Sequence, residues 1–347
     1  MDEQLGAATT RTGTMPAWRQ TRYGEVDAVA LATVDTPAPG PREVLIRLAA
    51  TGLNNGDIRV MRGEPRIVRL AFGPARPRQA VRGMDAAGTV VAIGSDVSGL
   101  AVGDEVVGEL PGGGGLARFA VAPAARLVRR PPELDPVMAA TLPVAAGTAW
   151  QALELAGLPE EDAPRLRPPR VLVLGASGGV GTFTVQLASL RGADVWALCG
   201  ERNRQLVTGI GAAHTFDYRT VQPGSPELPA GGFDAVIDIA GTAPLRALQR
   251  LVRDGGRVVL VAGEGGRVLG PLPRLACAGL LSIGSKRPVR PLAATAKPEI
   301  LARLVALAAT GALRPVIERV WPFEGAPDAL AHVASGHAAG KVVVRGS

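Results

Sequence analysis

The chain has 347 residues, of which 47% are hydrophobic and 20% charged, and its formal net charge is +7. A chain of this length exceeds the size that one hydrophobic core usually serves, so two domains are expected. The composition is that of a globular protein, and no apolar run is long enough to suggest a membrane partner. The basic residues are spread singly and only 3% of the residues are aromatic, which argues against a nucleic-acid partner.

Two features bear on location and metal content. The cysteines, Cys199 and Cys277, are too few for a disulfide framework, and their spacing matches no metal motif. The first residues, MDEQLGAATTRTGT, carry no apolar signal core. We therefore predict a cytoplasmic protein, and the cysteines indicate no metal site.

Short apolar runs broken by Gly and Pro follow one another from about Pro16 to Pro132. They read VLIRLAA, GTVVAIG, DEVVGEL and ARFAVAP. That spacing predicts an antiparallel β domain. Within it, TGLNNGDIR at 51–59 places Asn54 and Asn55 before a glycine, a pattern that by itself predicts only a turn.

From about Leu134 strand-like and helix-like runs alternate. VLVLG at 171–175 and DVWALC at 194–199 predict strands, and FTVQLASLRGA between them predicts a helix. The alternation continues through LVTGIGAAHTFDY, FDAVIDIAG, LRALQRLVRDGG and RVVLVAG, and GLLSIGS closes it. Strands that are apolar on both faces predict a parallel sheet covered on both sides. After about Pro291 one helix, EILARLVALAATGAL, precedes the strand GKVVVRG, so we expect the tail to rejoin the first domain.

The run VLVLGASGGVGTF places three glycines at a three-residue spacing between a strand and a helix. Glycines there allow a tight turn and a close approach of the helix N-terminus to a pyrophosphate. A tight turn without a ligand is the alternative. The predicted dinucleotide-binding residues of this loop are Gly175, Ser177, Gly178, Gly179, Val180 and Gly181.

The end of the second strand indicates which dinucleotide binds. NAD enzymes carry an acidic residue about twenty residues beyond the loop, and that position is Gly200 here. Because no carboxylate stands there and Arg202 and Arg204 follow, the 2′-phosphate of NADPH is the better match. Glu201 weakens this interpretation, and the alternative is that both arginines begin a solvated helix.

The order of these parts resembles a known family. GLNNGD, GMDAAGTVVAIGSDVSGLAVGDEVVGE, LPVAAGTAWQAL, GASGGVG and GHAAGKVVV together resemble the zinc-independent medium-chain dehydrogenases/reductases, in the quinone oxidoreductase-like and enoyl reductase branch. The resemblance covers the chain from Met15 onward. It implies an α/β fold with a GroES-like (chaperonin-10-like) β-rich catalytic domain in two parts, 15–135 and 291–347. A Rossmann domain with a doubly wound parallel sheet at 136–290, an active site between the two, and a homodimer are also implied.

The resemblance assigns roles in the catalytic domain. Asn54 and Met84 stand where zinc alcohol dehydrogenases carry a cysteine and a histidine, and neither is a credible zinc ligand. Asn54 then positions the nicotinamide, whereas Asp57 and Asp85 match acidic positions that are either structural or catalytic. Arg59 replaces a tyrosine common in quinone reductases; it can bind an oxyanion but is no normal proton donor, and a surface ion pair is the alternative.

The resemblance also extends the cofactor site. Arg204 and Tyr218 match residues that hold a 2′-phosphate, and Thr148 matches a threonine near the cofactor. His337 lies in the closing segment that approaches the cofactor, whereas His214 and His332 are expected to be structural or exposed. The remaining predicted cofactor residues are Ala240, Gly241, Ala262 and Gly263 at two strand ends, and Lys341 in the closing segment.

The predicted function is an NADPH-dependent, zinc-independent reductase that transfers hydride to an activated C=C bond of an α,β-unsaturated carbonyl compound (an enone) or to a quinone. Hydride chemistry belongs to the cofactor, and the protein supplies orientation and electrostatics. Two alternatives stay open: a zinc-independent carbonyl reductase, and a cofactor-binding protein with little turnover.

Overall fold

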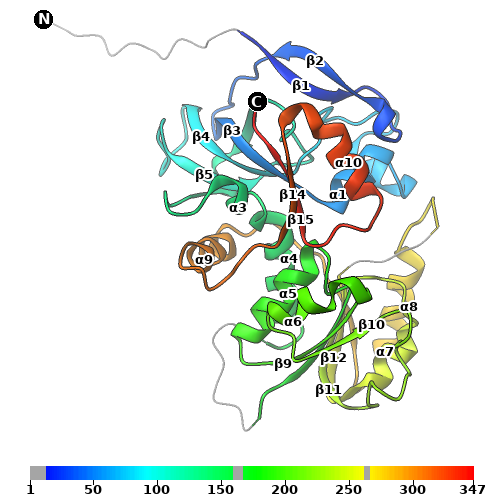
Figure 1. Cartoon of the computed structure of the whole chain (residues 1–347). Coiled ribbons are helices and arrows are strands. Elements are labelled where there is room, and N and C mark those ends of the chain that lie inside the picture. Colours follow the sequence, from blue (N-terminus) through cyan, green and yellow to red (C-terminus); the bar gives the residue numbers. More distant parts are fainter. Residues whose placement is uncertain (1–12, 159–166, 262–265) are drawn as a thin grey trace, which may run out of the picture.

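The computed structural model describes residues 13–158, 167–261 and 266–347, and two large sheets organise it (Figure 1). Ala262 and Gly263, two of the predicted cofactor residues, lie outside the described residues. Within these ranges no helix has the length and apolar character needed to cross a membrane.

The first sheet has seven strands and is antiparallel except for one parallel pair. Its order is β14-β15-β3-β4-β5-β7, with β6 also paired to β3, and a separate ribbon of β1 and β2 lies beside it. The strands are β1 Thr14–Gln20, β2 Val29–Asp35, β3 Glu43–Leu53, β4 Asp85–Ile93, β5 Glu105–Glu109, β6 Phe119–Pro123, β7 Leu127–Arg129, β14 Ile317–Trp321 and β15 Lys341–Arg345. Its helical segments are η1 Val26–Ala28, α1 Asn55–Arg62, η2 Arg66–Val68, α2 Arg69–Phe72, η3 Ala124–Arg126, α3 Pro136–Ala139, η6 Phe323–Gly325 and α10 Ala326–Ala334.

The second sheet has six strands, all parallel. Its order is β10-β9-β8-β11-β12-β13, which is the 3-2-1-4-5-6 order of a doubly wound dinucleotide-binding sheet. The strands are β8 Arg170–Leu174, β9 Asp194–Cys199, β10 His214–Asp217, β11 Phe233–Asp238, β12 Val252–Leu260 and β13 Val289–Pro291. The helical segments are η4 Leu142–Ala146, α4 Gly147–Leu155, α5 Gly179–Leu190, η5 Glu201–Asn203, α6 Arg204–Gly209, α7 Leu245–Leu251, α8 Leu272–Ser282 and α9 Pro298–Ala309. The predicted fold class is confirmed.

Two local predictions differ from the structure. GLLSIGS does not form a strand, because its first four residues belong to α8 and the last strand is β13. A short apolar run fits a buried strand and a helix equally well, so periodicity could not separate them. TGLNNGDIR is not a simple turn either: β3 ends at Leu53, Asn54 is the N-cap residue, and α1 begins at Asn55.

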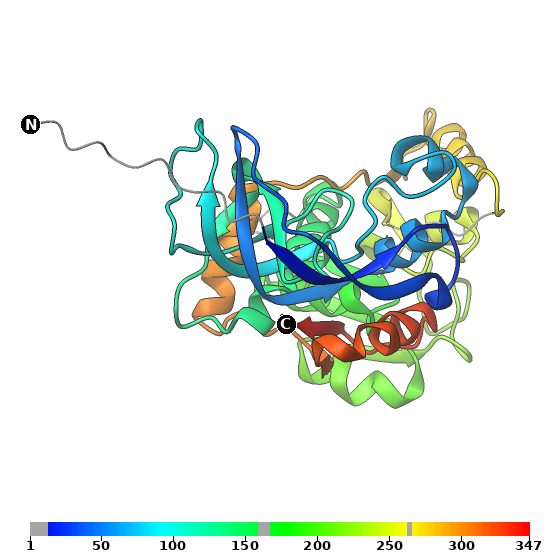
Figure 2. The same cartoon turned by 90° about the horizontal axis from the view of Figure 1, so that it is seen from above.

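The tail connects the two sheets. In β15, Val342 pairs with Leu53 of β3, and just before it Gly340 forms a parallel bridge with Gly178. Figure 1 and Figure 2 show α10, in red, beside the blue β-rich half, where it contacts α1, β3 and β15. The domain bounds of 15–135, 136–290 and 291–347 stay a prediction.

Candidate active site

The phosphate loop has the geometry that its glycines predict. Gly175 follows β8 with φ +82°, and Gly178 is the extended N-cap residue of α5. A Cβ at Gly181 would lie 2.1 Å from the Gly175 carbonyl oxygen, so glycine is required there for the turn. A Cβ at Gly178 would come no closer than 3.6 Å to that oxygen, so glycine is not needed there for packing. The bare Gly178 backbone and the free first N–H groups of α5 fit a pyrophosphate.

The tail packs against this loop. The Gly340 N–H donates to the Ser177 carbonyl oxygen over 2.8 Å. A Cβ at Gly179 would lie 3.2 Å from Lys341 Cδ. The structure therefore brings the predicted residues Ser177, Gly178 and Gly179 together with Lys341, although about 160 residues separate them in sequence.

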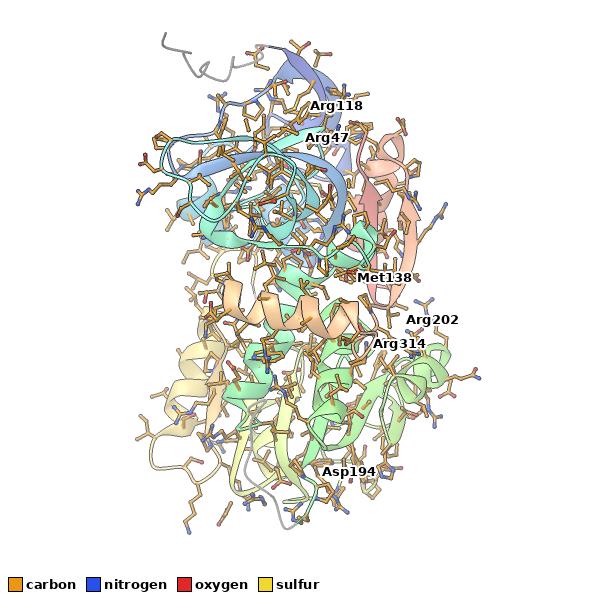
Figure 3. The ribbon with its side chains drawn as sticks, turned by 90° about the vertical axis from the view of Figure 1, so that its left-hand side faces the viewer. Arg47, Arg118, Met138, Asp194, Arg202 and Arg314 are labelled. Atoms are coloured by element: carbon orange, nitrogen blue, oxygen red, sulfur yellow. The ribbon has the colours of Figure 1, made fainter. Side chains whose placement is uncertain are left out.

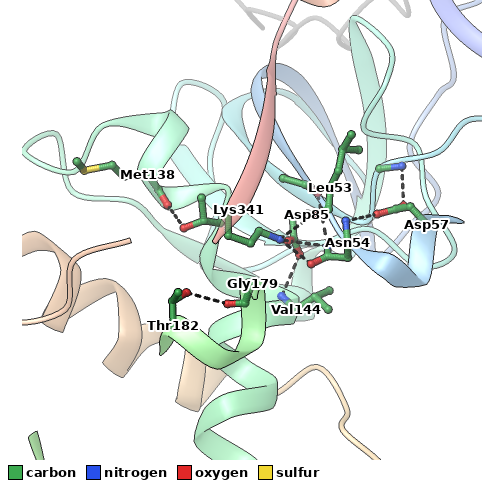
Figure 4. A network of polar contacts seen from close by, with 12 residues as sticks. Leu53, Asn54, Asp57, Asp85, Met138, Val144, Gly179, Thr182 and Lys341 are labelled. Carbon is green, nitrogen blue, oxygen red and sulfur yellow. Dashed lines mark hydrogen bonds and ion pairs between the residues drawn. The ribbon is translucent and has the colours of Figure 1, made fainter. Parts of the chain in front are cut away.

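The Lys341 side chain leaves the loop and enters the β-rich half. Its ammonium donates to Asn54 Oδ1 over 2.6 Å, to the Leu53 carbonyl oxygen over 3.0 Å and to Asp85 Oδ2 over 3.2 Å (Figure 4). The residue is only 2% exposed. Because an ammonium has three N–H donors, these three protein acceptors can use all of them.

Asp85 holds the other side of the network. Its Oδ2 accepts from Asn54 Nδ2 over 2.9 Å and its Oδ1 accepts from the Val144 N–H over 2.9 Å. The carboxylate is fully buried, and burial raises its pKa while Lys341 acts in the opposite direction. A Cβ at Gly52 would lie 2.2 Å from the Ala140 carbonyl oxygen and 3.1 Å from Asp85 Oδ2, so the Ala140 backbone above all requires a glycine in β3 beside this carboxylate. Both ends of the Asn54 amide are thus oriented by charged partners.

Asp57 fixes the start of α1. Its Oδ2 accepts from the Asn54 N–H over 2.9 Å and its Oδ1 from the Gly83 N–H over 2.8 Å. The side chain is fully buried, and burial raises its pKa to about 6 although both backbone N–H groups lower it. These contacts describe a residue that positions Asn54. Arg59 lies two residues further along α1 and is half-buried; its predicted catalytic role stays a prediction.

The position that carries a histidine ligand in zinc relatives lies beside the same helix. A Cβ at Gly56 in α1 would lie 3.5 Å from Met84 Sδ. Across residues 13–158, 167–261 and 266–347 no group of three or more His, Cys, Asp or Glu residues could hold a metal ion. A thioether and an amide are poor zinc ligands.

Residues of three segments gather at the end of β9. A Cβ at Gly200 would lie 3.6 Å from Tyr218 Cε1 and 3.7 Å from Arg219 Nη1. Arg204 Nη1 is 3.1 Å from both carboxylate oxygens of Glu201, and Arg202 Nη2 donates to the His337 carbonyl oxygen over 2.6 Å. Figure 3 shows Arg202 on the outer face of the Rossmann half, on the side of the tail. Sequence reasoning missed Arg219, although it directly follows Tyr218.

The end of β11 is tied to α8. The Gly241 N–H donates to Asp238 Oδ1 over 2.8 Å, and Arg274 Nη2 lies 2.9 Å from Asp238 Oδ2. Burial raises the pKa of Asp238, and Arg274 partly offsets that effect. Sequence reasoning missed this pair, because α8 carries no motif. A Cβ at Gly175 would lie 3.2 Å from the Ala240 nitrogen, so this strand end adjoins the phosphate loop.

Thr148 is the second residue of α4 and is half-buried. Its contact with a cofactor stays a prediction, as do the cofactor contacts of Val180 and the other residues assigned above.

The geometry of the two halves defines the class of protein. A doubly wound sheet with a glycine loop, joined to a β-rich half through a buried polar network, is the architecture of an oxidoreductase that uses a nicotinamide dinucleotide.

Comparison with known proteins narrows the class to a family. Residues 40–132 match the alcohol dehydrogenase GroES-like domain, and residues 210–344 match the zinc-binding dehydrogenase domain. The chloroplast envelope quinone oxidoreductase homolog of Arabidopsis thaliana is 37% identical over 338 residues, covering 95% of this chain and 98% of that protein. The 2-methylene-furan-3-one reductase of Solanum lycopersicum is 31% identical, covering 98% of this chain and 83% of that protein.

A solved structure shows the same fold. The quinone oxidoreductase from Coxiella burnetii superimposes with a TM-score of 0.81 at 24% identity, covering 96% of this chain and 99% of that one. The chain belongs to the medium-chain dehydrogenase/reductase family, in its zinc-independent, quinone oxidoreductase-like branch. It is an NAD(P)H-dependent reductase with a small-molecule substrate.

The predicted cytoplasmic location is wrong on this comparison. One relative is named for the chloroplast envelope, two more are named as chloroplastic, and the NAD(P)H oxidoreductase RTN4IP1 of Mus musculus is named as mitochondrial. The absence of an apolar signal core at the start of the chain was a poor guide, because organelle targeting does not depend on such a core.

Proposed function

We propose that the protein is an NADPH-dependent, zinc-independent reductase of an activated C=C bond in an α,β-unsaturated carbonyl compound, or of a quinone. The observation that carries this proposal is the network of Asn54, Asp85 and Lys341 beside the phosphate loop. By the family resemblance this oriented amide stands at a position where zinc relatives carry a metal ligand, which supports a reaction without zinc. The Solanum lycopersicum relative supports the substrate class, because the compound in its name carries a methylene group conjugated to a ketone.

The residues present fit a dinucleotide. The glycine loop and the start of α5 would hold the pyrophosphate, and the end of β9 would hold the adenosine ribose. When bound, the nicotinamide supplies a hydride to the electrophilic carbon of the substrate. The cofactor residues that we propose are Thr148, Gly175, Ser177, Gly178, Gly179, Val180, Gly181, Gly200, Arg202, Arg204, Tyr218, Ala240 and Gly241.

The protein's own residues orient the reacting groups and stabilise the charge that develops on the substrate. We assign the Asn54 amide and the Arg59 guanidinium to the negative charge that develops on the substrate oxygen. Lys341 and Asp85 act as positioning residues, because they bond to the oxygen and the nitrogen of that amide. Asp57 holds the Asn54 backbone from the other side. A proton then comes from water.

A homodimer is the proposed assembly. Apolar side chains are exposed at both ends of α8: Leu272 and Leu280 are exposed by 43% and 72%, and Ile283, directly after the helix, is exposed by 78%. The helix is joined to the edge strand β13 by the Ser282 hydroxyl, which donates to the Val289 carbonyl oxygen over 2.9 Å. An apolar face beside a sheet edge is suited to a second copy. Light scattering should give the mass of a dimer, and Ile283→Asp should shift it toward the monomer.

The experiment that tests the function is NADPH oxidation with matched substrates. Each enone should be compared with its saturated ketone, and a quinone should be included, with product analysis by mass spectrometry. We expect turnover of enones or quinones and none of the saturated ketones. Turnover of saturated ketones alone would instead identify a carbonyl reductase, and tight NADPH binding without turnover of any substrate would identify a cofactor-binding protein.

A further inference from the structure

Three arginines, Arg202, Arg204 and Arg219, lie near the end of β9, where the 2′-phosphate of NADPH would bind. The structure distinguishes between them by their contacts with other protein groups. We infer that Arg219 is the main cation for the 2′-phosphate of NADPH and so determines the choice of dinucleotide. This inference rests on the proposed NADPH dependence. It concerns a residue that neither the sequence motifs nor the family resemblance singled out.

The position of Arg219 comes from strand pairing. β10 runs parallel to β9, with Asp217 opposite Cys199, and the Tyr218 N–H donates to the Cys199 carbonyl oxygen over 3.1 Å. The chain leaving β10 is thereby held beside Gly200. The Arg219 guanidinium lies 4.9 Å from the centre of the Tyr218 ring, so the two side chains form one stacked surface.

That surface faces the position that decides dinucleotide choice. The side chain at the end of the second strand is an acid when the ribose carries a 2′-hydroxyl. Here Gly200 has no side chain, and Arg219 Nη1 would lie 3.7 Å from a Cβ built on it. A guanidinium thus lies next to the place that a carboxylate would occupy, and it presents a planar set of donors suited to phosphate.

The other arginines are more committed to protein partners. Arg204 pairs with both oxygens of Glu201 and its Nε is 3.4 Å from Thr215 Oγ1, and Arg202 bonds the His337 carbonyl oxygen. The Arg219 guanidinium has a looser ion pair, 3.7 Å from Asp217 Oδ1, and its side chain is 61% exposed. Asp217 in turn accepts the Arg219 backbone N–H over 3.1 Å. Of the three arginines, Arg219 therefore loses the weakest protein contacts when its guanidinium binds a phosphate.

Binding of NADPH and of NADH should be measured for Arg219→Ala, Arg204→Ala and the exposed control Arg250→Ala, by quenching of tryptophan fluorescence. Arg219→Ala removes one charged contact, so it should weaken NADPH binding about 10- to 100-fold. It should change NADH binding less than about twofold. Arg204→Ala should weaken NADPH binding less than Arg219→Ala does, because Glu201 already engages the Arg204 guanidinium, and Arg250→Ala should change the binding of neither dinucleotide. Thermal melting checks that each variant folds.

A second variant sharpens the test. Glu201→Gln removes the charge that pairs with Arg204, so adding Glu201→Gln to Arg219→Ala should recover part of the lost NADPH affinity. If wild type prefers NADPH and Arg219→Ala keeps that preference, the inference is overturned while the proposed function stands. If wild type binds neither dinucleotide, or prefers NADH, the proposed cofactor itself is wrong and the inference falls with it.

Discussion

The Lys341 ammonium lies 2.6 Å from Asn54 Oδ1, although the two residues are 287 positions apart in the chain. The lysine follows Gly340, which is bonded to the phosphate loop, and the asparagine caps α1 in the β-rich half. One side chain therefore joins the proposed cofactor site to the proposed reaction site. Its ion pair with Asp85 is buried on both sides, with side-chain exposures of 2% and 0%.

That burial predicts the effect of removing one partner. Lys341→Met leaves the Asp85 carboxylate buried without a cation, which should lower the free energy of unfolding by about 3 to 5 kcal/mol. The double variant Asp85→Asn with Lys341→Met removes both charges and should recover about 2 kcal/mol of that loss. Urea unfolding of the two single variants and the double variant measures the coupling. Strictly additive losses would contradict the pairing.

Asn54 and Asn55 give a matched test of the amide. Asn54→Ala should lower turnover about 10- to 1000-fold, because an oriented donor is lost. It should also lower stability by about 1 to 3 kcal/mol, because Lys341 and Asp85 each lose a partner. Asn55 is exposed, so Asn55→Ala should change neither quantity appreciably. Steady-state kinetics with an enone and thermal melting measure both, and equal activity of the two variants would return Asn54 to a purely structural role.

Asp57 predicts a pH dependence of stability. Its pKa is about 6 in the folded protein, against an ordinary value of 3.8 for a solvated aspartate, so between these values the folded state binds the extra proton. The contribution of Asp57 to the free energy of unfolding is therefore greatest below about pH 4. It decreases by on the order of 3 kcal/mol as the pH rises to about 6. Asp57→Asn cannot titrate and should lack this component. The free energy of unfolding of both proteins from pH 4 to pH 7 measures the difference, and parallel curves would contradict the assignment.

Two glycines of the phosphate loop should behave differently. Gly181→Ala places a Cβ 2.1 Å from a carbonyl oxygen, so it should destabilise the fold by several kcal/mol. Gly178→Ala meets only ordinary contacts and should change stability by less than about 1 kcal/mol. If the pyrophosphate approaches Gly178, this second variant should still weaken dinucleotide binding by about tenfold or more. Unchanged affinity in a well-folded Gly178→Ala protein would show that the dinucleotide lies elsewhere.

Metal removal provides an independent test of the catalytic half. Because Asn54 and Met84 replace the zinc-binding residues, a chelator should leave NADPH oxidation unchanged, and elemental analysis should find no stoichiometric zinc. Activity that is lost with a chelator and restored by added zinc would contradict this. The control is the same treatment of a zinc-dependent alcohol dehydrogenase.

Sequence by itself determined the features that depend on neighbours along the chain. The glycine spacing at 175–181, the apolar strands and the periodic helices follow from local backbone geometry and burial, so the class of fold could be predicted. The roles of Asn54 and of the 2′-phosphate residues came from resemblance, which locates positions without giving their contacts.

Tertiary structure decided which distant groups share a site. Strand pairing of β15 with β3 brings Lys341 to Asn54, and pairing of β10 with β9 brings Arg219 to Gly200. The Arg274 pair with Asp238 likewise depends on how α8 packs. No local pattern encodes these meetings, because each depends on the register and packing of segments far apart in sequence, whose side chains become neighbours only when the sheets form.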